Sequence, residues 1–428
     1  MTSILNLLRL LIILVALLPI IFFSKKFFLY HLLNLCGPSF IKLGQMLSTR
    51  PDLIGEDLAQ ILAKFQDKIK PFKKRQVIKT INSEFANNFD KYFKEFNFTP
   101  IASASIAQVH CAKLIDDTKV AVKILRPNIA KKVKRDIKTL KLITKVSFFI
   151  SKSLNIFLND ILQLLQENSK SELDLTVEAS NCSQLKDNLK NLKGFYVPQV
   201  FWSLSTKKIM VIEWLDGIPF SDKKNIIASN FDKNKIARNL VLSYFTQVYQ
   251  YGFFHGDMHP GNLILLKNGD IGVVDFGIMG IIDDKTKIAI ARIVIGFIEK
   301  DYNKIAQIHI DAGLVPPNTN AKKLALSCRK IGETVVGSKV KEIALGGLLQ
   351  NLIKMTEEFQ MSTKPELLLL QKTILLIEGI GAMLNPEINI WDYAKPWMKE
   401  WSKTHIGFDA KIVEIIKDFF KIINLSKN

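Results

Sequence analysis

The sequence predicts an α+β fold of two lobes, in which a small lobe containing a sheet precedes a mainly helical one. Gln108–Leu114 and Lys119–Leu125 have the length and apolar content of strands, with a short turn rich in aspartate between them. A second pair of short apolar strands is predicted within residues 263–274, around an Asn-Gly turn. The chain from there to Asn428 has a predominantly helical pattern.

The composition is that of a globular protein with an excess of positive charge. Of the 428 residues, 48% are hydrophobic, which excludes wholesale disorder. The net charge of +19 favours an anionic membrane surface as a partner, and no nucleic acid is expected because no nucleic-acid-binding motif or zinc spacing accompanies the charge. A general composition bias toward Lys, Ile and Asn accounts for part of this positive charge. The cysteines are far apart and indicate a reducing compartment: Cys36, Cys111, Cys182 and Cys328.

The patterns divide the chain into four segments. Residues 1–24 are predicted to form a hydrophobic membrane anchor or an interfacial helix, and residues 25–98 a helical extension. Residues 99–216 would form the small lobe and residues 217–428 the helical lobe. A chain of 428 residues is long enough for two or three domains, or for one bilobal enzyme with an extension.

The first segment carries an apolar run, Ile4–Phe23, that is just long enough to span a hydrocarbon core. Lys25 and Lys26 follow directly and would hold that end on the cytoplasmic side. A cleaved signal peptide fits poorly because no small-residue cleavage site follows. A spanning anchor, an interfacial helix and a buried core helix remain open.

The clearest chemistry lies in the stretch His255–Asn262 and the aspartate that follows it. Asp257, Asn262 and Asp275 have the spacing H-x-D-x-x-x-x-N…D-F-G of phosphoryl-transfer enzymes. Asn262 and Asp275 are the predicted Mg²⁺ ligands, because this cation prefers amide and carboxylate oxygens. Asp257 would face the attacking hydroxyl or water. The strand pair between Asn262 and Asp275 would bring these two residues side by side. The alternative is a surface loop that happens to be rich in Asp, Asn and Gly, and it does not account for the spacing and the strand pair together.

A phosphate-binding loop and a lysine are predicted in the small lobe. Residues 102–109 match G-x-G-x-x-G-x-V with alanine in place of each glycine. Because the alanine Cβ restricts the backbone, this loop should be stiffer and should hold ATP phosphates differently. Lys123 ends a V-A-V-K sequence and would reach the α- and β-phosphates, although a strand lysine can also simply reach to solvent. The predicted loop residues are Ala102, Ser103, Ala104, Ser105, Ile106, Ala107, Gln108 and Val109.

A helix predicted from about Asp160 to Leu189 carries two glutamates of interest. Glu178 is the predicted partner of Lys123. Glu172 lies six residues earlier, which is about 120° around a continuous helix, and therefore needs a different partner. Solvated charges on a helix are the alternative for either residue.

Further strands are predicted at Phe195–Phe201 and Lys208–Glu213, and a further helix at Phe231–Tyr251. Glu213 and Leu215 stand where the backbone of a hinge would contact adenine. No A-P-E motif and no room for an activation segment follow Asp275, so a protein substrate is not expected.

Several motifs together resemble one family. They are Lys42-x-Gly44-Gln45, Ser48–Asp52, the alanine-rich loop, Glu172-x-Asp174 and His255–Asn262. This combination, from about residue 37 to 395, resembles the UbiB/AarF family of atypical protein-kinase-like ATPases, which are tied to ubiquinone biosynthesis. The resemblance implies a bilobal protein-kinase-like fold whose N-terminal helices cover the active site.

The resemblance also implies residue roles and partners. The lysine of K-x-G-Q pairs with the first glutamate of E-x-D in the family, which corresponds to Lys42 and Glu172 here. The implied function is an ATPase or kinase at the cytoplasmic side of the bacterial inner membrane, acting on a lipid-like quinone precursor and working with other ubiquinone-biosynthesis enzymes. Many members end in a hydrophobic transmembrane pair; the sequence before Asn428 shows none, so Ile4–Phe23 is the expected anchor.

Two other functions stay open. A nucleotide-binding scaffold without turnover is disfavoured because Lys123, Asp257, Asn262 and Asp275 are all present. An aminoglycoside- or choline-type phosphotransferase would share H-x-D-x-x-x-x-N, but it would have no need of the motif at Lys42.

Overall fold

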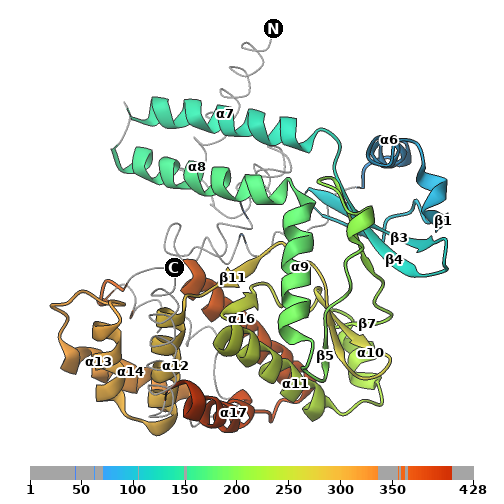
Figure 1. Ribbon diagram of the computed structural model, residues 1–428. Coiled ribbons are helices and arrows are strands. Elements are labelled where there is room, and N and C mark those ends of the chain that lie inside the picture. The colour runs from blue at the N-terminus through green and yellow to red at the C-terminus, as the bar shows by residue number, and fades with distance from the viewer. Residues whose placement is uncertain are drawn as a thin grey trace, which may run out of the picture. The chain divides into compact units, whose positions relative to one another are not determined.

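The described residues of this computed structural model fall into two compact units (Figure 1). The first unit comprises the chain up to Gln184 together with Pro198–Trp214, and the second comprises Leu185–Val197 together with Leu215–Asn428. The proposed anchor Ile4–Phe23 and Lys42 lie outside the described residues. The structure describes Gly44, Leu62 and residues 71–104, 106–148, 152–335, 355, 358–361 and 365–406.

An antiparallel sheet is the centre of the first unit. Among the described residues it has five strands in the order β1-β3-β4-β6, with β2 paired to β3. The β3–β4 hairpin sets Val109 opposite Lys123, and its turn residue Asp117 has a φ of 64°, which aspartate tolerates better than most residues. This hairpin confirms the prediction. The strands are β1 (Phe93–Phe96), β2 (Ala102–Ser103), β3 (Ala107–Leu114), β4 (Lys119–Leu125) and β6 (Ile209–Glu213).

One face of this sheet is packed against α6 (Lys74–Glu84). Val120, Val122 and Ile124 of β4 are completely buried in the cluster that α6 joins. Because side chains alternate along a strand, Lys123 lies on the opposite face. Short 3₁₀ turns, η1 (Phe89–Lys91) and η2 (Trp202–Leu204), connect elements on this side.

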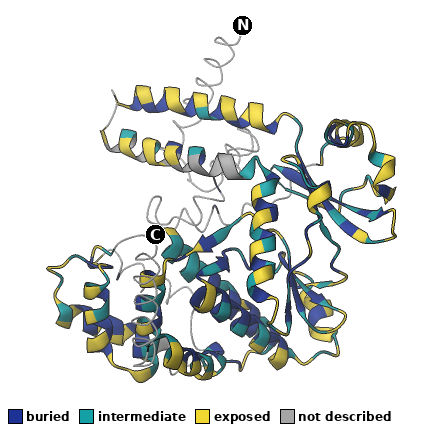
Figure 2. Cartoon of the chain, in the orientation of Figure 1, coloured by how far each residue is buried: buried dark blue, intermediate teal, exposed yellow. Residues whose placement is uncertain are grey.

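Three helices complete the described part of the first unit. The helix α7 (Ile129–Ser147) is rich in basic residues, and its buried residues lie along one side (Figure 2). It packs beside α8 (Lys152–Glu172), as Figure 1 shows. The third helix, α9 (Leu175–Leu189), runs from the first unit into the second.

The prediction of a single helix from about Asp160 to Leu189 is wrong. The chain leaves helical geometry after Glu172 and starts again at Leu175. Asp174 causes the restart, because its Oδ1 accepts hydrogen bonds from the Thr176 N–H at 3.1 Å and the Thr176 hydroxyl at 2.5 Å. An angle measured around one helix therefore does not relate Glu172 to Glu178.

Short strands form the sheets of the second unit. One has the order β5-β10-β9-β7 and another pairs β8 with β11, within the part of the chain that is described. The predicted pair around the Asn-Gly turn is confirmed as the β9–β10 hairpin, whose Gly269 has a φ of 86°. The strands are β5 (Phe195–Tyr196), β7 (Gly217–Pro219), β8 (Phe253–His255), β9 (Leu263–Leu266), β10 (Ile271–Val273) and β11 (Met279–Ile281).

Two other predicted elements differ in extent. The strand expected at Phe195–Phe201 is limited to β5 and one isolated bridge at Val200, because Pro198 between them has no N–H to donate. The helix expected at Phe231–Tyr251 begins at Lys233, where the carboxylate of Asp232 accepts two backbone N–H groups. It ends as a π-helical segment, η3 (Thr246–Tyr251).

Helices make up most of the second unit. The longest of those described, α16, packs against α11, as both lie together in Figure 1. It is long and apolar enough to cross a membrane, but buried core helices meet the same criterion. The helices are α10 (Lys223–Ala228), α11 (Lys233–Phe245), α12 (Asp284–Glu299), α13 (Tyr302–Asp311), α14 (Ala321–Val335), α16 (Pro365–Leu384) and α17 (Ile390–His405).

Glu378 of α16 is buried, and burial raises the pKa of its carboxyl to about 7. The folded state therefore keeps a proton that the unfolded state releases above its ordinary pKa of 4.5, and the free energy of unfolding falls as the pH rises from 4.5 to about 7. We expect Glu378→Gln to be more stable than the wild type by up to about 3 kcal/mol at about pH 8, and to match it near the lower end of this window. Urea unfolding at both pH values tests this; a difference that does not change with pH contradicts it.

Candidate functional site

Lys123 and Glu178 form an ion pair within the first unit. The Lys123 Nζ lies 2.6 Å from the Glu178 Oε1, and the side chains are 17% and 10% exposed. β4 directs Lys123 away from the core around α6, and the start of α9 after Asp174 places Glu178 in the first turn of that helix. Because both groups are largely removed from water, each depends on the charge of the other.

Glu172 and Lys42 are not brought together by any described contact. Glu172 ends α8 and is half-buried, and Lys42 is outside the described residues. Their pairing stays a prediction.

The alanine-rich loop is closed by hydrogen bonds from Arg126. It joins β2 to β3, and the Ala104 N–H donates to the Ala107 carbonyl at 2.9 Å. The Arg126 Nε and Nη2 both donate to the Ala104 carbonyl, at 3.1 and 2.9 Å, and Nη2 donates to the Ser103 hydroxyl at 3.0 Å. Its backbone N–H donates to the Ile106 carbonyl at 2.7 Å. Partial burial lowers the pKa of Arg126 from its ordinary high value, and the guanidinium stays charged.

Arg126 was missed by the sequence reasoning. The signal was present, because the β3–β4 register pairs Ala107 with Leu125 and so puts the next residue beside the loop. The guanidinium adds a side-chain restraint to a loop whose alanines already restrict the backbone.

Gln108, near the C-terminal end of the predicted loop, makes hydrogen bonds inside the first unit. Gln108 is buried, its Oε1 accepts a hydrogen bond from the Phe72 N–H at 3.0 Å, and its Nε2 lies 2.8 Å from the His110 Nε2. Burial lowers the pKa of His110. Ala107 is also buried, Val109 is half-buried, and Ser105 lies outside the described residues.

The two predicted hinge residues belong to different units. Glu213 ends β6, where its Oε2 accepts a hydrogen bond from the Gln199 N–H at 3.1 Å. Leu215 opens the second unit and is buried. A Cβ on Gly272 would lie 2.7 Å from the Leu215 Cδ1, so β10 runs close beneath this leucine.

His255 joins the two segments of the second unit that carry Asp257 and Asp275. Its ring is completely buried; the Nε2 lies 2.7 Å from the Asp275 carbonyl and the Nδ1 lies 3.2 Å from the Asp257 backbone nitrogen. Since the Asp257 N–H must donate, Nδ1 is the acceptor and Nε2–H donates to the carbonyl. Burial lowers the pKa of His255, which agrees with this neutral form.

The predicted metal ligands are adjacent through their backbones. The Val274 N–H donates to the Asn262 carbonyl at 2.9 Å, and the Asn262 Nδ2 donates to the Asp257 carbonyl at 2.9 Å. This hydrogen bond engages the amide nitrogen of Asn262, so its amide oxygen is the atom that the predicted cation would contact. Asp275 is exposed and has a φ of 63°, a left-handed conformation that aspartate tolerates better than most residues, as at Asp117.

Two nitrogen groups face the Asp257 carboxylate. The Lys372 Nζ lies 3.0 Å from Oδ1, and the His259 Nε2 lies 3.6 Å from Oδ2. The sequence reasoning missed Lys372, which is 115 residues away in the chain and belongs to none of the motifs. Within the described ranges, no three His, Cys, Asp or Glu residues gather as a metal-binding group. A kinase-type magnesium site needs no such group because phosphate oxygens supply the other ligands.

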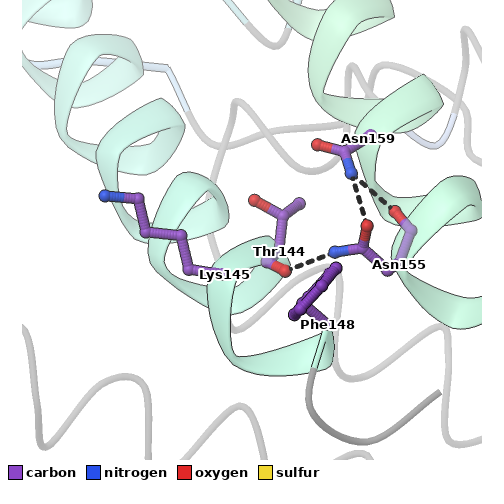
Figure 3. A pocket seen from close by; sticks show the side chains of 5 residues that line it. All are labelled: Thr144, Lys145, Phe148, Asn155 and Asn159. Carbon is purple, nitrogen blue, oxygen red and sulfur yellow. Dashed lines mark hydrogen bonds between the residues drawn. The ribbon is translucent and has the colours of Figure 1, made fainter. Parts of the chain in front are cut away.

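A shallow pocket of about 460 Å³ lies between α7 and α8 (Figure 3). The Asn155 Nδ2 donates to the Thr144 carbonyl at 2.6 Å, and the Asn159 Nδ2 to the Asn155 Oδ1 at 3.1 Å. The pocket is lined by Thr144, Lys145, Phe148, Asn155 and Asn159. None of these is a predicted site residue.

Breaking the buried ion pair should destabilise the chain. Lys123→Met deprives the buried Glu178 carboxylate of its counter-charge, and we expect a loss of about 3 kcal/mol in the free energy of unfolding. The control Lys94→Met breaks an exposed pair with Asp117, with side chains 50% and 63% exposed, and should cost less than about 1 kcal/mol. Urea unfolding of both variants checks the difference, and equal losses contradict it.

Removing the guanidinium should loosen the alanine-rich loop. We expect Arg126→Met to speed amide hydrogen exchange at residues 104–107 by roughly tenfold, because hydrogen bonds from a charged donor are lost. Lys131→Met on the exposed side of α7 is the matched control and should leave these amides unchanged. Unchanged exchange in Arg126→Met would show that the loop is held by its backbone alone.

Comparison with known proteins identifies the family. Residues 64–309 match the ABC1 atypical kinase-like domain, and residues 328–389 match the UbiB helical domain. A probable protein kinase UbiB of Azotobacter vinelandii is 37% identical over 381 residues, which are 88% of this chain and 71% of the relative. One of Pseudomonas aeruginosa is 36% identical over 376 residues, 87% of this chain and 70% of the relative.

A solved structure is also similar. The complex of Rv3197 with erythromycin from Mycobacterium tuberculosis superposes with a TM-score of 0.61 at 26% identity, covering 85% of this chain and 91% of that one. The sheet-containing first unit and the helical second unit agree with this likeness, which confirms the predicted α+β kinase-like fold. The chain therefore belongs to the ABC1 atypical kinase-like family, among its UbiB proteins.

Proposed function

We propose that this protein is an ATP-dependent atypical kinase or ATPase that supports ubiquinone biosynthesis at the membrane. The observation that carries the proposal is the hydrogen-bonded arrangement of Asp257, Asn262 and Asp275 around the buried His255. On neighbouring backbone segments, Asp257 would supply one carboxylate for the acceptor, and Asn262 and Asp275 would supply two oxygen ligands for a cation. Relatives named probable protein kinase UbiB support the same reading.

The donor set fits magnesium. Asn262 offers an amide oxygen because its nitrogen is engaged with the Asp257 carbonyl, and Asp275 offers a carboxylate at an exposed position. One or two such ligands together with phosphate oxygens are typical of Mg²⁺ sites in kinases. When bound, the ion would neutralise charge on the phosphates.

The chain's own residues then have distinct roles. Lys123, held by Glu178, would contact the α- and β-phosphates, and the loop fixed by Arg126 would cover them. Asp257 would orient the acceptor hydroxyl or water and take its proton. Backbone groups of Glu213 and Leu215 are the candidates for adenine.

The remaining two site residues come from the family resemblance. Lys42 would reach the nucleotide and pair with Glu172, giving the family-specific lysine a partner separate from Glu178. This pairing would tie the N-terminal extension to the phosphates.

We infer that the acceptor side serves a lipid-like quinone precursor, with an anionic membrane surface and other ubiquinone-biosynthesis enzymes as partners. The net charge of +19 supports attraction to anionic lipids. The exposed side of α7 contributes to it with a row of basic residues: Lys131, Lys132, Lys134, Arg135, Lys138, Lys141 and Lys145. The expected location is the cytoplasmic side of the bacterial inner membrane.

Turnover should depend on Asp275. We expect Asp275→Asn to lower the rate of ATP hydrolysis by roughly 10²–10³-fold, because charge neutralisation supplies most of phosphoryl-transfer catalysis. The full-length protein would be assayed with anionic vesicles containing a phenolic quinone precursor. Asp284→Asn, an exposed residue of α12, is the control and should keep the wild-type rate.

The same assay separates the alternatives. Normal hydrolysis by Asp275→Asn would refute the metal assignment. Wild-type protein that binds ATP tightly but never turns it over would instead indicate a non-catalytic nucleotide-binding scaffold.

A further inference from the structure

Helix α16 lies directly, along one face, against the loop His255–Asn262, which is the proposed catalytic loop. Leu369, Lys372 and Thr373 share this face because residues three and four apart are neighbours on a helix. The Thr373 hydroxyl is completely buried, 3.1 Å from the Gly256 carbonyl and 2.8 Å from the Leu369 carbonyl. A Cβ on Gly256 would lie 2.5 Å from the Leu369 Cδ2, so the helix occupies the space of a side chain at this loop position.

This contact presents Lys372 to Asp257 in a fixed place. The ammonium lies 3.0 Å from the carboxylate, and the side chains are 34% and 23% exposed, so the pair is accessible to a ligand. Both backbones are held, because Thr373 fixes the helix and His255 and Asn262 fix Asp257. The lysine is therefore a positioned positive charge beside the group that would receive the acceptor's proton.

The reaction creates a need for such a charge. The acceptor oxygen forms a bond to the γ-phosphorus, the bond from that phosphorus to the β,γ-bridging oxygen breaks, and its electron pair leaves on ADP. The acceptor's proton passes to Asp257, which later releases it to solvent. In the transition state, negative charge is spread over the oxygens of the γ-phosphoryl group, next to the acceptor that Asp257 would hold. An ammonium has three N–H donors, and the Asp257 carboxylate needs only one of them.

We propose that Lys372 is a catalytic cation, contacting the phosphoryl group in transit to the acceptor, and that the helical domain thereby completes the catalytic site. The inference rests on the proposed function. It assigns a reaction role to residues 328–389, which match a family model separate from that of the kinase-like domain at 64–309.

The opposite role for the same ion pair is a lock. In that case Lys372 would keep Asp257 from accepting a proton, and removing the lysine would speed turnover. The site geometry favours catalysis, because the lysine is held by a buried hydroxyl contact of its own helix and not by a loop that is able to withdraw.

The test compares ATP turnover and ATP binding in full-length wild type, Lys372→Met, Lys372→Gln and Lys372→Arg. We expect Lys372→Met and Lys372→Gln to lose roughly 10²–10³-fold in turnover while the dissociation constant of a fluorescent ATP analogue changes by less than about threefold. Lys372→Arg should recover part of the rate because it keeps the charge. Lys399→Met, an exposed lysine of α17, is the control for loss of one positive charge.

Three results would overturn the inference. Turnover at or above the wild-type rate in Lys372→Met refutes it, and the faster rate identifies the lock. Parallel losses of ATP binding, thermal stability and turnover in all three Lys372 variants indicate a structural role. Wild type that hydrolyses no ATP refutes the proposed function itself, and this inference with it, whereas an active wild type with an equally active Lys372→Met refutes the inference alone.

Discussion

The buried imidazole of His255 is the constraint on which the candidate site depends. It is neutral, it receives the Asp257 N–H on one nitrogen, and it donates to the Asp275 carbonyl with the other. Phe276 packs edge-on against the same ring at 5.8 Å and is itself completely buried. The positions of Asp257 and Asp275 are thus set by hydrogen bonds between their backbone atoms and an uncharged ring. A charged residue in this place would be costly, because no water reaches it.

In the first unit, secondary structure positions the two charged side chains of the Lys123–Glu178 ion pair. Lys123 is aimed by strand alternation, and Glu178 is aimed by a helix start that Asp174 defines. A carboxylate in the first turn of a helix is also favoured by the helix dipole. The capping interaction of Asp174 therefore places Glu178 where it can pair with Lys123. This placement does not require the continuous helix that the sequence suggested.

Local patterns made much of the fold predictable, and tertiary placement limited the rest. The β3–β4 and β9–β10 hairpins follow from alternation and from turn residues, which act over a few positions. The helix break was missed because no Gly or Pro interrupts residues 160–189, although Asp174, two positions before Thr176, is itself a capping signal. Lys372 had no such signal, since only the docking of α16 brings it to Asp257.

The contact between Gly256 and Thr373 also has a consequence for how the chain folds. The loop around Gly256 is synthesised more than a hundred residues before α16, and the Gly256 carbonyl gains its threonine partner only when α16 packs against the loop. Contacts so far apart in sequence are made late, because the intervening chain must first be ordered. A nascent chain that has reached the end of the kinase-like segment already carries every motif residue, yet its loop acquires its final support from a later part of the same polypeptide.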